Sequence, residues 1–241
     1  MATYRIADLG VDMNPTYPLL QKQAAPYRVE GAAVDVRLYL SETDLDEKDR
    51  LHPHLTREEC EYFFLGAQFY TYLLDHSGCL LHASAVALDG KAYLFSAPCG
   101  TGKSTHTGLW RQYFGEDAEI LNDDKPAIRL IDDTLWVYGT PFSGKVDLSA
   151  NKRAPLAGIC MLEQGSENRI RRLTPAEALP LLMQQTIRPT ASVRMDNLLT
   201  RLDEILRNVP VYRMSCTISE EAVQVSYQAM SGNRYADRVK K

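Results

Sequence analysis

The hydrophobic and polar positions of this 241-residue chain alternate in short segments, with a few longer stretches of helical spacing between them. Residues 4–11 and 33–40 have the alternating pattern and are predicted to be strands. In the second segment Val34, Val36 and Leu38 fall on one face, because successive side chains of a strand point to opposite sides. Turns that contain proline separate the two segments. We therefore expect a small sheet near the N-terminus.

A helix is predicted over about residues 57–75. Thr56 and Glu59 have the spacing of a capping box, in which each side chain bonds the backbone N–H of the other residue. Apolar residues then recur at helical spacing, at Phe63, Ala67, Tyr70 and Leu74. An aromatic face of this kind is more typical of core packing than of a cofactor site.

Further helices are predicted in the C-terminal half. A second capping box joins Thr174 to Glu177, and Pro175 occupies the first helical position. A backbone N–H at this position has no intrahelical partner, so the helix loses no hydrogen bond to proline there. Pro180 should kink or shorten this helix. Two more helices are expected at 195–208 and 220–230.

Strands dominate the rest of the chain, at 79–88, 92–96, 119–121, 127–131, 135–138, 156–162, 169–173 and 211–215. The pair Asp89-Gly90 lies between two apolar runs and predicts a hairpin. The strand at 92–96 should therefore have an antiparallel neighbour, and we expect an α/β fold with a mixed, partly antiparallel sheet. Because no linker marks a boundary, residues 1–241 are expected to form one domain, with the sheet and helix of residues 1–78 packed on a catalytic core of residues 79–241.

The composition excludes several classes of protein. A hydrophobic content of 45% supports a real core, and a formal net charge of -4 argues against nucleic acid as a partner. The five cysteines are odd in number and show no Cys-x-x-Cys spacing, so neither a disulfide framework nor a zinc site is indicated. No apolar run has the length of a signal core or a membrane span, which predicts a cytoplasmic protein without a membrane partner.

Residues 97–105, Ala-Pro-Cys-Gly-Thr-Gly-Lys-Ser-Thr, have the context of a phosphate-binding loop, since an apolar strand precedes them and a helix-like segment follows. The glycines let backbone N–H groups face the phosphates, Lys103 can reach the outer phosphates, and the Ser104 hydroxyl can bind Mg²⁺. The alternative is a glycine-rich turn before an ordinary helix, and Ala97 stands where the pattern usually starts with glycine. We predict ATP and Mg²⁺ as cofactors, with nucleotide-binding residues Cys99, Gly100, Thr101, Gly102, Lys103, Ser104 and Thr105.

Three polar side chains near strand ends suggest phosphoryl transfer. The adjacent carboxylates of Asp123 and Asp124 can divide two tasks, holding the metal and accepting the proton of the attacking hydroxyl. Both can act only if the pair lies at a strand end or a turn; a solvated Asx turn is the alternative. His82 lies one strand before the glycine-rich loop, although a histidine in an apolar strand is often simply a core residue.

As an ordered set, His82-Ala-Ser-Ala, Gly100-Thr-Gly-Lys-Ser-Thr105 and Asp123-Asp124 resemble the nucleotide site of phosphoenolpyruvate carboxykinase and the catalytic domain of HPr kinase/phosphorylase, which share a fold. The resemblance covers about residues 80–126. It implies a catalytic trio of Asp123, His82 and Lys103, with Asp123 as the base and His82 beside it, and a metal held by Ser104 and Asp124. Carboxykinases are about twice this length, and the signature segment of HPr kinase is missing after the acidic pair.

The predicted function is an ATP-dependent kinase that transfers the γ-phosphate to a hydroxyl of a peptide, protein or small molecule. Candidate acceptor-binding residues are Ser143, Lys145 and Arg188, although an ordinary turn and a solvated loop are the alternatives for them. Two other functions stay open: phosphorolysis or carboxykinase-type transfer to another acceptor, and a non-catalytic ATP-binding module in a biosynthetic assembly. No motif in the chain encodes the identity of the acceptor or the oligomeric state.

Overall fold

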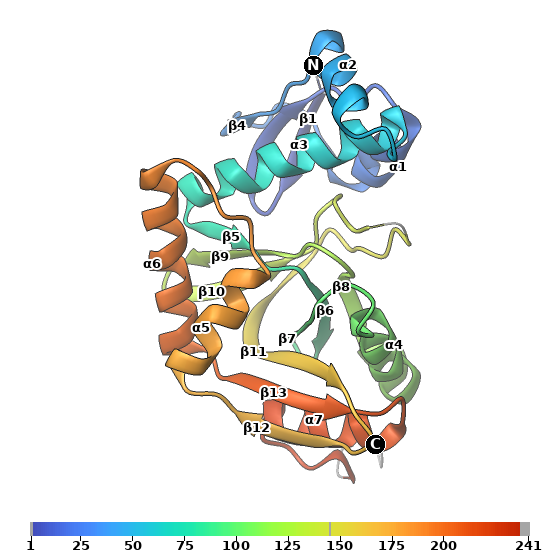
Figure 1. Cartoon of the computed structure of the whole chain (residues 1–241), viewed down its shortest axis with the longest axis vertical. Coiled ribbons are helices and arrows are strands. Elements are labelled where there is room, and N and C mark those ends of the chain that lie inside the picture. The colour runs from blue at the N-terminus through green and yellow to red at the C-terminus, as the bar shows by residue number, and fades with distance from the viewer. Residues whose placement is uncertain (1, 145, 237–241) are drawn as a thin grey trace.

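The N-terminal segment folds into a small four-stranded sheet that lies over a larger, curled sheet (Figure 1). The computed structural model describes residues 2–144 and 146–236. The small sheet has the order β3-β1-β2-β4 and contains β1 (Ala2–Ile6), β2 (Leu9–Met13), β3 (Arg28–Val29) and β4 (Val36–Arg37). A sheet in this region is as predicted, but its strands are shorter than the hydrophobic pattern suggested.

The strand predicted at 4–11 is in fact a hairpin. Ala7 and Asp8 turn the chain with φ values of 51° and 60°. Positive φ at both turn positions matches the right-handed twist of the flanking strands, but it usually requires glycine or asparagine. Since this Ala-Asp pair carries no such signal, the alternation of the two strands looks continuous in the sequence.

Two short helices of the N-terminal segment were not predicted. They are α1 (Pro18–Ala24), which continues into a 3₁₀ turn (Ala25–Tyr27), and α2 (Glu42–Leu51). Ser41 caps α2 through a capping box closed by Asp44 instead of the usual glutamate or glutamine. Within the segment predicted as a strand at 33–40, only Val36 and Arg37 pair in the sheet.

Helix α3 (Arg57–Leu73) confirms the predicted helix and its capping box. A 3₁₀ turn (Leu74–His76) follows, and Ser77, with φ of 57°, ends the helical path. The aromatic face of α3 is buried only in part: Phe69 and Tyr70 belong to a hydrophobic cluster that also contains Ile6 of the small sheet and Phe142. Of the four positions predicted for this face, Tyr70 and Leu74 are buried, whereas Phe63 and Ala67 are exposed. This cluster joins the N-terminal segment to the rest of the molecule.

The larger sheet is mixed, as predicted. Its strands β7 and β11 are parallel, as are β11 and β13, whereas β6 and β7 form the antiparallel hairpin expected from Asp89 and Gly90. The main path has the order β5-β9-β10-β11-β7-β6-β8, and β13 and β12 extend it from β11. The strands are β5 (Gly78–Leu80), β6 (Ala83–Leu88), β7 (Lys91–Ser96), β8 (Glu119–Asn122), β9 (Ala127–Ile131), β10 (Thr134–Tyr138), β11 (Arg153–Gln164), β12 (Arg169–Arg172) and β13 (Val211–Cys216).

The main path curls so that its two end regions approach each other. Strands β5 and β6 stand near opposite ends of the order, yet only residues 81 and 82 connect them, and residues 123–126 connect β8 to β9 in the same way. A chain advances at most about 3.8 Å per residue, so the two ends of the path must lie close together. The backbone N–H of Ala83 donates to the carbonyl of Asp124, which ties the two links to each other at 3.2 Å. We call this junction the seam.

Helices cover both faces of the sheet. Helices α5 (Pro175–Gln184) and α6 (Ser192–Asn208) pack on the side that contains Leu94, whereas α4 (Lys103–Phe114) and α7 (Glu220–Ser231) pack on the side that contains Tyr93 and Phe95. Successive side chains of β7 therefore belong to two different hydrophobic clusters, one on each face of the sheet. Helix α5 continues past Pro180, so the proline does not end it there. A 3₁₀ turn (Gly115–Asp117) follows α4. None of the helices described has the length and apolar character needed to cross a membrane.

Candidate active site

Residues 97–102, which we call the glycine loop, connect β7 to α4. Gly100 and Gly102 have φ values of 79° and 114°, which L-residues with side chains rarely adopt. Ala97 does not share this conformation; its side chain is buried at the end of β7, so a glycine is not needed at this position. Strand, loop and helix are thus arranged as the sequence predicted.

The N-terminus of α4 offers backbone donors. Gly102 is the N-cap residue and provides no side-chain acceptor, whereas α2, α3, α5 and α7 are each capped by a serine or threonine hydroxyl. The first N–H groups of a helix have no intrahelical partner, and together with the helix dipole they attract an anion. Ser104 and Thr105 are exposed on this first turn.

Lys103 is folded back over the glycine loop. Its Nζ donates to the carbonyl oxygen of Ala97 at 3.1 Å, and the residue is only 7% exposed. Burial lowers the pKa of the Lys103 ammonium, and this effect is opposed by the negative charges of Asp124 and Asp123. The two carboxylates therefore favour the charged form of the lysine.

Asp123 and Asp124 follow β8 in a tight turn. The side-chain oxygen of Asn122 accepts hydrogen bonds from the backbone N–H groups of Asp124 and Lys125, at 3.0 and 2.6 Å. This Asx turn breaks the strand, so the two carboxylates are not forced to opposite faces of the sheet. A solvated Asx turn was the alternative to a catalytic pair. In the structure, an Asx turn is the element that positions Asp123 and Asp124.

The carboxylate of Asp123 lies on the side of α4. The Ser84 hydroxyl donates to its Oδ1 at 2.6 Å, and the same hydroxyl is 2.7 Å from the hydroxyl of Thr107 on α4. Thr107 in turn contacts the carbonyl oxygens of Lys103 and Ser104. Asp123 is thereby linked to the first turn of α4, which carries Ser104.

Asp124 is the direct partner of His82. The Nε2 atom of His82 is 3.1 Å from Oδ1 of Asp124, and Lys125 forms an ion pair with the other carboxylate oxygen. Burial raises the pKa of Asp124, but the hydrogen bond from His82 and the charge of Lys125 outweigh it and bring that pKa to about 2. The resemblance implied that His82 stands beside Asp123; the contact in the structure is with Asp124.

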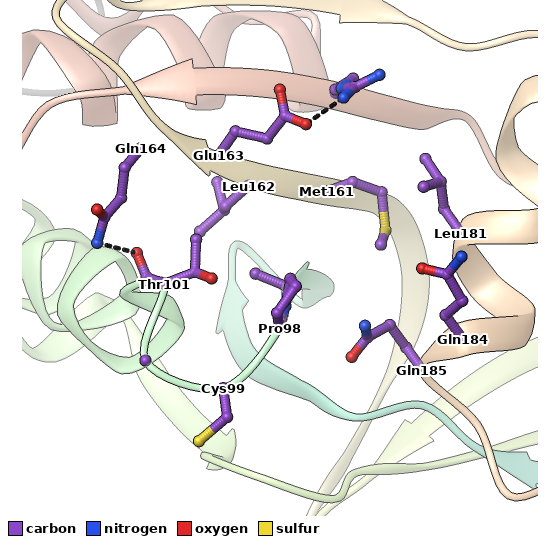
Figure 2. Close-up of a pocket in the computed structure, with 13 residues that line it drawn as sticks. Pro98, Cys99, Thr101, Met161, Leu162, Glu163, Gln164, Leu181, Gln184 and Gln185 are labelled. Carbon is purple, nitrogen blue, oxygen red and sulfur yellow. Dashed lines mark hydrogen bonds and ion pairs between the residues drawn. The ribbon is translucent and has the colours of Figure 1, made fainter.

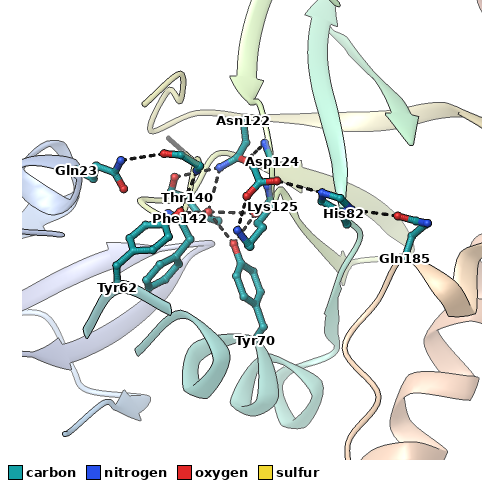
Figure 3. A network of polar contacts seen from close by, with 11 residues as sticks. Gln23, Tyr62, Tyr70, His82, Asn122, Asp124, Lys125, Thr140, Phe142 and Gln185 are labelled. Carbon is teal, nitrogen blue, oxygen red and sulfur yellow. Dashed lines mark hydrogen bonds and ion pairs between the residues drawn. The ribbon is translucent and has the colours of Figure 1, made fainter. Parts of the chain in front are cut away.

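His82 lies in the seam, in the link between β5 and β6 and outside both strands. The loop after α5 holds it: the backbone N–H of His82 donates to the carbonyl of Gln185 at 2.7 Å, and Nδ1 is 3.1 Å from Oε1 of Gln185. Figure 3 shows His82 between Asp124 and Gln185, with one ring nitrogen facing each. No sequence signal points to Gln185, because 103 positions separate the two residues.

The N-terminal segment forms one wall of the site. Tyr70 of α3 donates its hydroxyl to the carbonyl of Lys125, and the Lys125 ammonium lies 5.7 Å from the ring centre of Tyr62 and 5.4 Å from that of Phe63. Tyr62 also accepts a hydrogen bond from the backbone N–H of Gly144 at 2.9 Å. The aromatic face of α3, predicted only as packing, therefore also positions polar groups beside Asp124 (Figure 3).

The predicted acceptor-binding residues lie in two different places. Ser143 is buried and donates to Asp147 at 3.2 Å, whereas Arg188 is exposed in the loop between α5 and α6, three residues after Gln185. Lys145 is outside the described residues. Gly144 packs on Asp124, since a Cβ built there would be 3.0 Å from the Asp124 Cβ.

Two cavities border the glycine loop. The first, of about 660 Å³, lies between the loop, the end of β11 and the C-terminal end of α5, and Figure 2 shows its lining. We call it the α5 cavity. The second, of about 550 Å³, lies over the first turns of α4, beside Thr105, Leu109 and Thr217. Cys99 is exposed and lines the α5 cavity.

Among the described residues, no three His, Cys, Asp or Glu side chains are grouped closely enough to hold a metal by themselves. The side-chain oxygens beside the glycine loop include the carboxylates of Asp123 and Asp124 and the exposed hydroxyl of Ser104. Such hard oxygen ligands suit Mg²⁺, which commonly takes only one or two carboxylates and completes its shell with phosphate oxygens and water.

Comparison with known proteins identifies no family. No family model matches the chain, and no curated protein matches it. A search of solved structures finds the HPr(Ser) kinase/phosphatase from Coxiella burnetii, at 10% sequence identity and a TM-score of 0.35. The match covers 64% of this chain and 95% of that protein. A TM-score this low does not establish a common fold, so the function must be inferred from the residues of the site.

Proposed function

We propose that this protein is an ATP-dependent, Mg²⁺-requiring kinase that transfers the γ-phosphate to a hydroxyl. One observation carries the proposal: Ser84 and Thr107 link Asp123, one of two adjacent carboxylates, to the first turn of α4, which carries Lys103 and directly follows the glycine loop. Phosphoryl transfer needs little covalent chemistry from the protein, and positioning and charge stabilisation supply most of its rate. These are the tasks that this set of groups can perform.

The glycine loop and α4 would bind the phosphates. Backbone N–H groups at the start of α4 provide donors, and the glycines at 100 and 102 allow the backbone to approach closely. Lys103, now bonded to the Ala97 carbonyl, would exchange that contact for an outer phosphate. Bound Mg²⁺ would neutralise charge on the outer phosphate oxygens.

We propose that the two carboxylates divide their tasks by position. Asp123, which is linked through Ser84 and Thr107 to the turn carrying Ser104, would hold the metal with Ser104. Asp124, whose side chain is 24% exposed beside His82, is the more accessible carboxylate for an acceptor hydroxyl. This reverses the roles expected from the resemblance, and the contacts of His82 favour the reversal.

The proposed chemical step is a displacement at the γ-phosphorus of ATP. The acceptor oxygen forms a bond to the γ-phosphorus while the bond from that phosphorus to the β,γ-bridging oxygen breaks. The electron pair of the broken bond stays on ADP, and the hydroxyl proton passes to the Asp124 carboxylate. His82 and Lys125 hold that carboxylate in place before transfer.

Lys103→Ala tests nucleotide binding. It should weaken MgATP binding by about tenfold or more, because it removes the ammonium that meets the outer phosphates. Lys91→Ala is the matched control, since Lys91 is exposed at the start of β7, away from the loop. Isothermal titration calorimetry measures the MgATP affinity of both variants. Equal affinity in the two would contradict the phosphate-binding role of Lys103.

Asp123→Asn and Asp124→Asn separate the two carboxylates. If Asp123 holds the metal, its variant should need a higher Mg²⁺ concentration for half-maximal turnover. If Asp124 accepts the proton, its variant should keep the Mg²⁺ requirement and lose kcat by about a hundredfold or more. The opposite pattern would restore the roles implied by the resemblance.

Two other functions are kept as candidates, because the site would serve them as well. A phosphorolytic enzyme would release pyrophosphate from a phosphorylated acceptor and inorganic phosphate, which coupled assays detect. A non-catalytic ATP-binding module would bind MgATP tightly and turn over no acceptor in a broad screen. A base beside the γ-phosphate is not needed for binding alone, which favours catalysis.

A further inference from the structure

We propose that the α5 cavity binds the phosphoryl acceptor and selects one whose hydroxyl is borne on an uncharged, partly aliphatic carrier. The inference rests on the proposed kinase function and adds the place and the chemical class of its second substrate.

The position of Lys103 distinguishes the two cavities. Its ammonium, which would meet the outer phosphates, lies at the carbonyl of Ala97, and Ala97, Pro98 and Cys99 line the α5 cavity. The other cavity lies over the helix, beside Thr105 and Leu109, further along the path of the phosphates. A nucleotide that runs across the loop would thus place its terminal phosphate toward the α5 cavity and its nucleoside toward the other.

Gln185 connects the α5 cavity to the catalytic groups. It lines the cavity, its Oε1 is 3.1 Å from Nδ1 of His82, and His82 contacts Asp124. Among the described residues that line the other cavity, none belongs to this chain of contacts. An acceptor in the α5 cavity would therefore contact Gln185, and His82 alone separates Gln185 from Asp124, the group proposed to receive the proton.

The lining of the α5 cavity is aliphatic and amide-bearing. Pro98, Met161 and Leu181 present apolar surface, and Gln184 and Gln185 present side-chain amides (Figure 2). An amide both donates and accepts, so it can bond neutral polar groups such as hydroxyls and other amides.

The two charged residues that line the α5 cavity are already neutralised by each other. Glu163 and Arg213 form an ion pair with each other, so the described lining has no unmatched charge to offer a ligand. Desolvating a carboxylate or an ammonium against aliphatic carbon is costly when no opposite charge receives it. A neutral acceptor is consequently favoured over an anionic or a cationic one.

Three ATP derivatives test this assignment without the natural acceptor itself. Each is esterified on the γ-phosphate with the same three-carbon arm, which ends in a primary amide, a carboxylate or an ammonium. All three esters carry the same phosphate charge, so differences in affinity report the environment of the arm alone. In the presence of Mg²⁺, the amide ester should bind about tenfold tighter than either charged ester.

Gln184→Trp locates the arm. Gln184 is exposed at the mouth of the α5 cavity, and an indole there should fill part of it without disturbing the core. The affinity of the amide ester relative to MgATP should fall by about tenfold. Leu179→Trp adds the same side chain to the same helix outside the cavity lining and should leave this ratio unchanged.

The outcomes separate this inference from the proposed function. If the wild-type protein binds neither MgATP nor any ester, the kinase proposal itself fails. If it binds MgATP and all esters with equal affinity, or if Gln184→Trp leaves the ratio unchanged, the nucleotide proposal survives and the acceptor assignment is overturned. Tighter binding of a charged ester would retain the location but reject the neutral class.

Discussion

A single glycine packs directly against the second carboxylate of the acidic pair. Gly144 has φ of 79° and lies so close to Asp124 that a Cβ there would be 3.0 Å from the Asp124 Cβ. Gly90 has a similar φ of 72° but no atom within 4 Å of such a Cβ. The two positions share the conformational requirement, but only at Gly144 would an added methyl group meet Asp124, so Gly90 serves as the control.

Gly144→Ala and Gly90→Ala should each lower the free energy of unfolding by about 1 kcal/mol, the cost of a left-handed alanine. Only Gly144→Ala should also reduce phosphoryl transfer, because its methyl group would displace the Asp124 carboxylate. Urea unfolding gives the first quantity, and turnover at saturating MgATP gives the second. Equal turnover in the two variants would show that the contact with Asp124 is unimportant for catalysis.

His106 should make stability depend on pH. It is buried on α4 against Ser226, and burial lowers its pKa from 6.5 to about 4. The unfolded chain therefore binds a proton more readily than the folded one, so stability present above pH 6.5 is lost as the pH falls toward 4. The full change attributable to this residue is about 3 kcal/mol.

His106→Gln tests that dependence. Removing the buried imidazole should flatten the loss of stability between pH 6.5 and pH 4, whereas the exposed His54→Gln should retain it. Unfolding midpoints in urea at several pH values provide the comparison. An unchanged pH profile in His106→Gln would assign the acid sensitivity to other groups.

At the scale of elements, helix α5 should influence catalysis through its own stability. Its capping box joins Thr174 to Glu177, and the residue after its last turn, Gln185, holds His82. Thr174→Ala should cost about 1 kcal/mol of stability. By loosening α5, the same change should also lower transfer activity.

Ser41→Ala is the control for this effect. It removes an equivalent capping box from α2, an element that contributes no residue to the proposed site. The two variants should lose similar stability, measured by thermal unfolding, and differ in kcat. A matching loss of kcat in both would mean that global destabilisation explains the result.

The sequence predicted the elements that carry their own local signals. The capping boxes of α3 and α5 and the Asp89-Gly90 hairpin are confirmed, because each depends on residues a few positions apart. The strand predicted at 79–88 is two strands, separated at residues 81 and 82. The chain passes there from one part of the sheet to another, although the apolar pattern continues without a break. Such a break depends on strand order, which local patterns do not encode.

The site was predictable only in part. The glycine loop and the acidic pair follow from spacing, and the structure pairs Asp124 with His82 and links Asp123 to the first turn of α4, which carries Lys103. Which carboxylate His82 contacts depends on the Asx turn at Asn122, and the support from Gln185 and Tyr70 comes from elements far away in the chain. Their roles in catalysis stay predictions.

At the scale of the whole molecule, the hydrophobic cluster shared by Ile6, Phe69 and Phe142 leads us to propose that residues 1–78 and 79–241 unfold together. The only two tryptophans report on different regions: Trp110 is buried between β7 and α7, and Trp136 packs against the shared cluster. Each can therefore serve as a local probe of one unfolding transition.

Incorporation of 5-fluorotryptophan should give two ¹⁹F signals, assigned with Trp110→Phe and Trp136→Phe. Both signals should change at the same urea concentration if the chain is one cooperative unit. Loss of the Trp136 signal at a lower concentration than the Trp110 signal would instead indicate that the N-terminal segment detaches first.

The seam also determines where the polypeptide can be lengthened. His82 and the acidic pair occupy its two short connections, whose lengths are set by the distance that each must span. One extra residue in either connection would shift a side chain of the proposed site along the backbone even if every strand still paired. An insertion at the Asp89-Gly90 turn, by contrast, would leave both connections intact. The molecule should thus accept insertions at that turn and reject them at the seam.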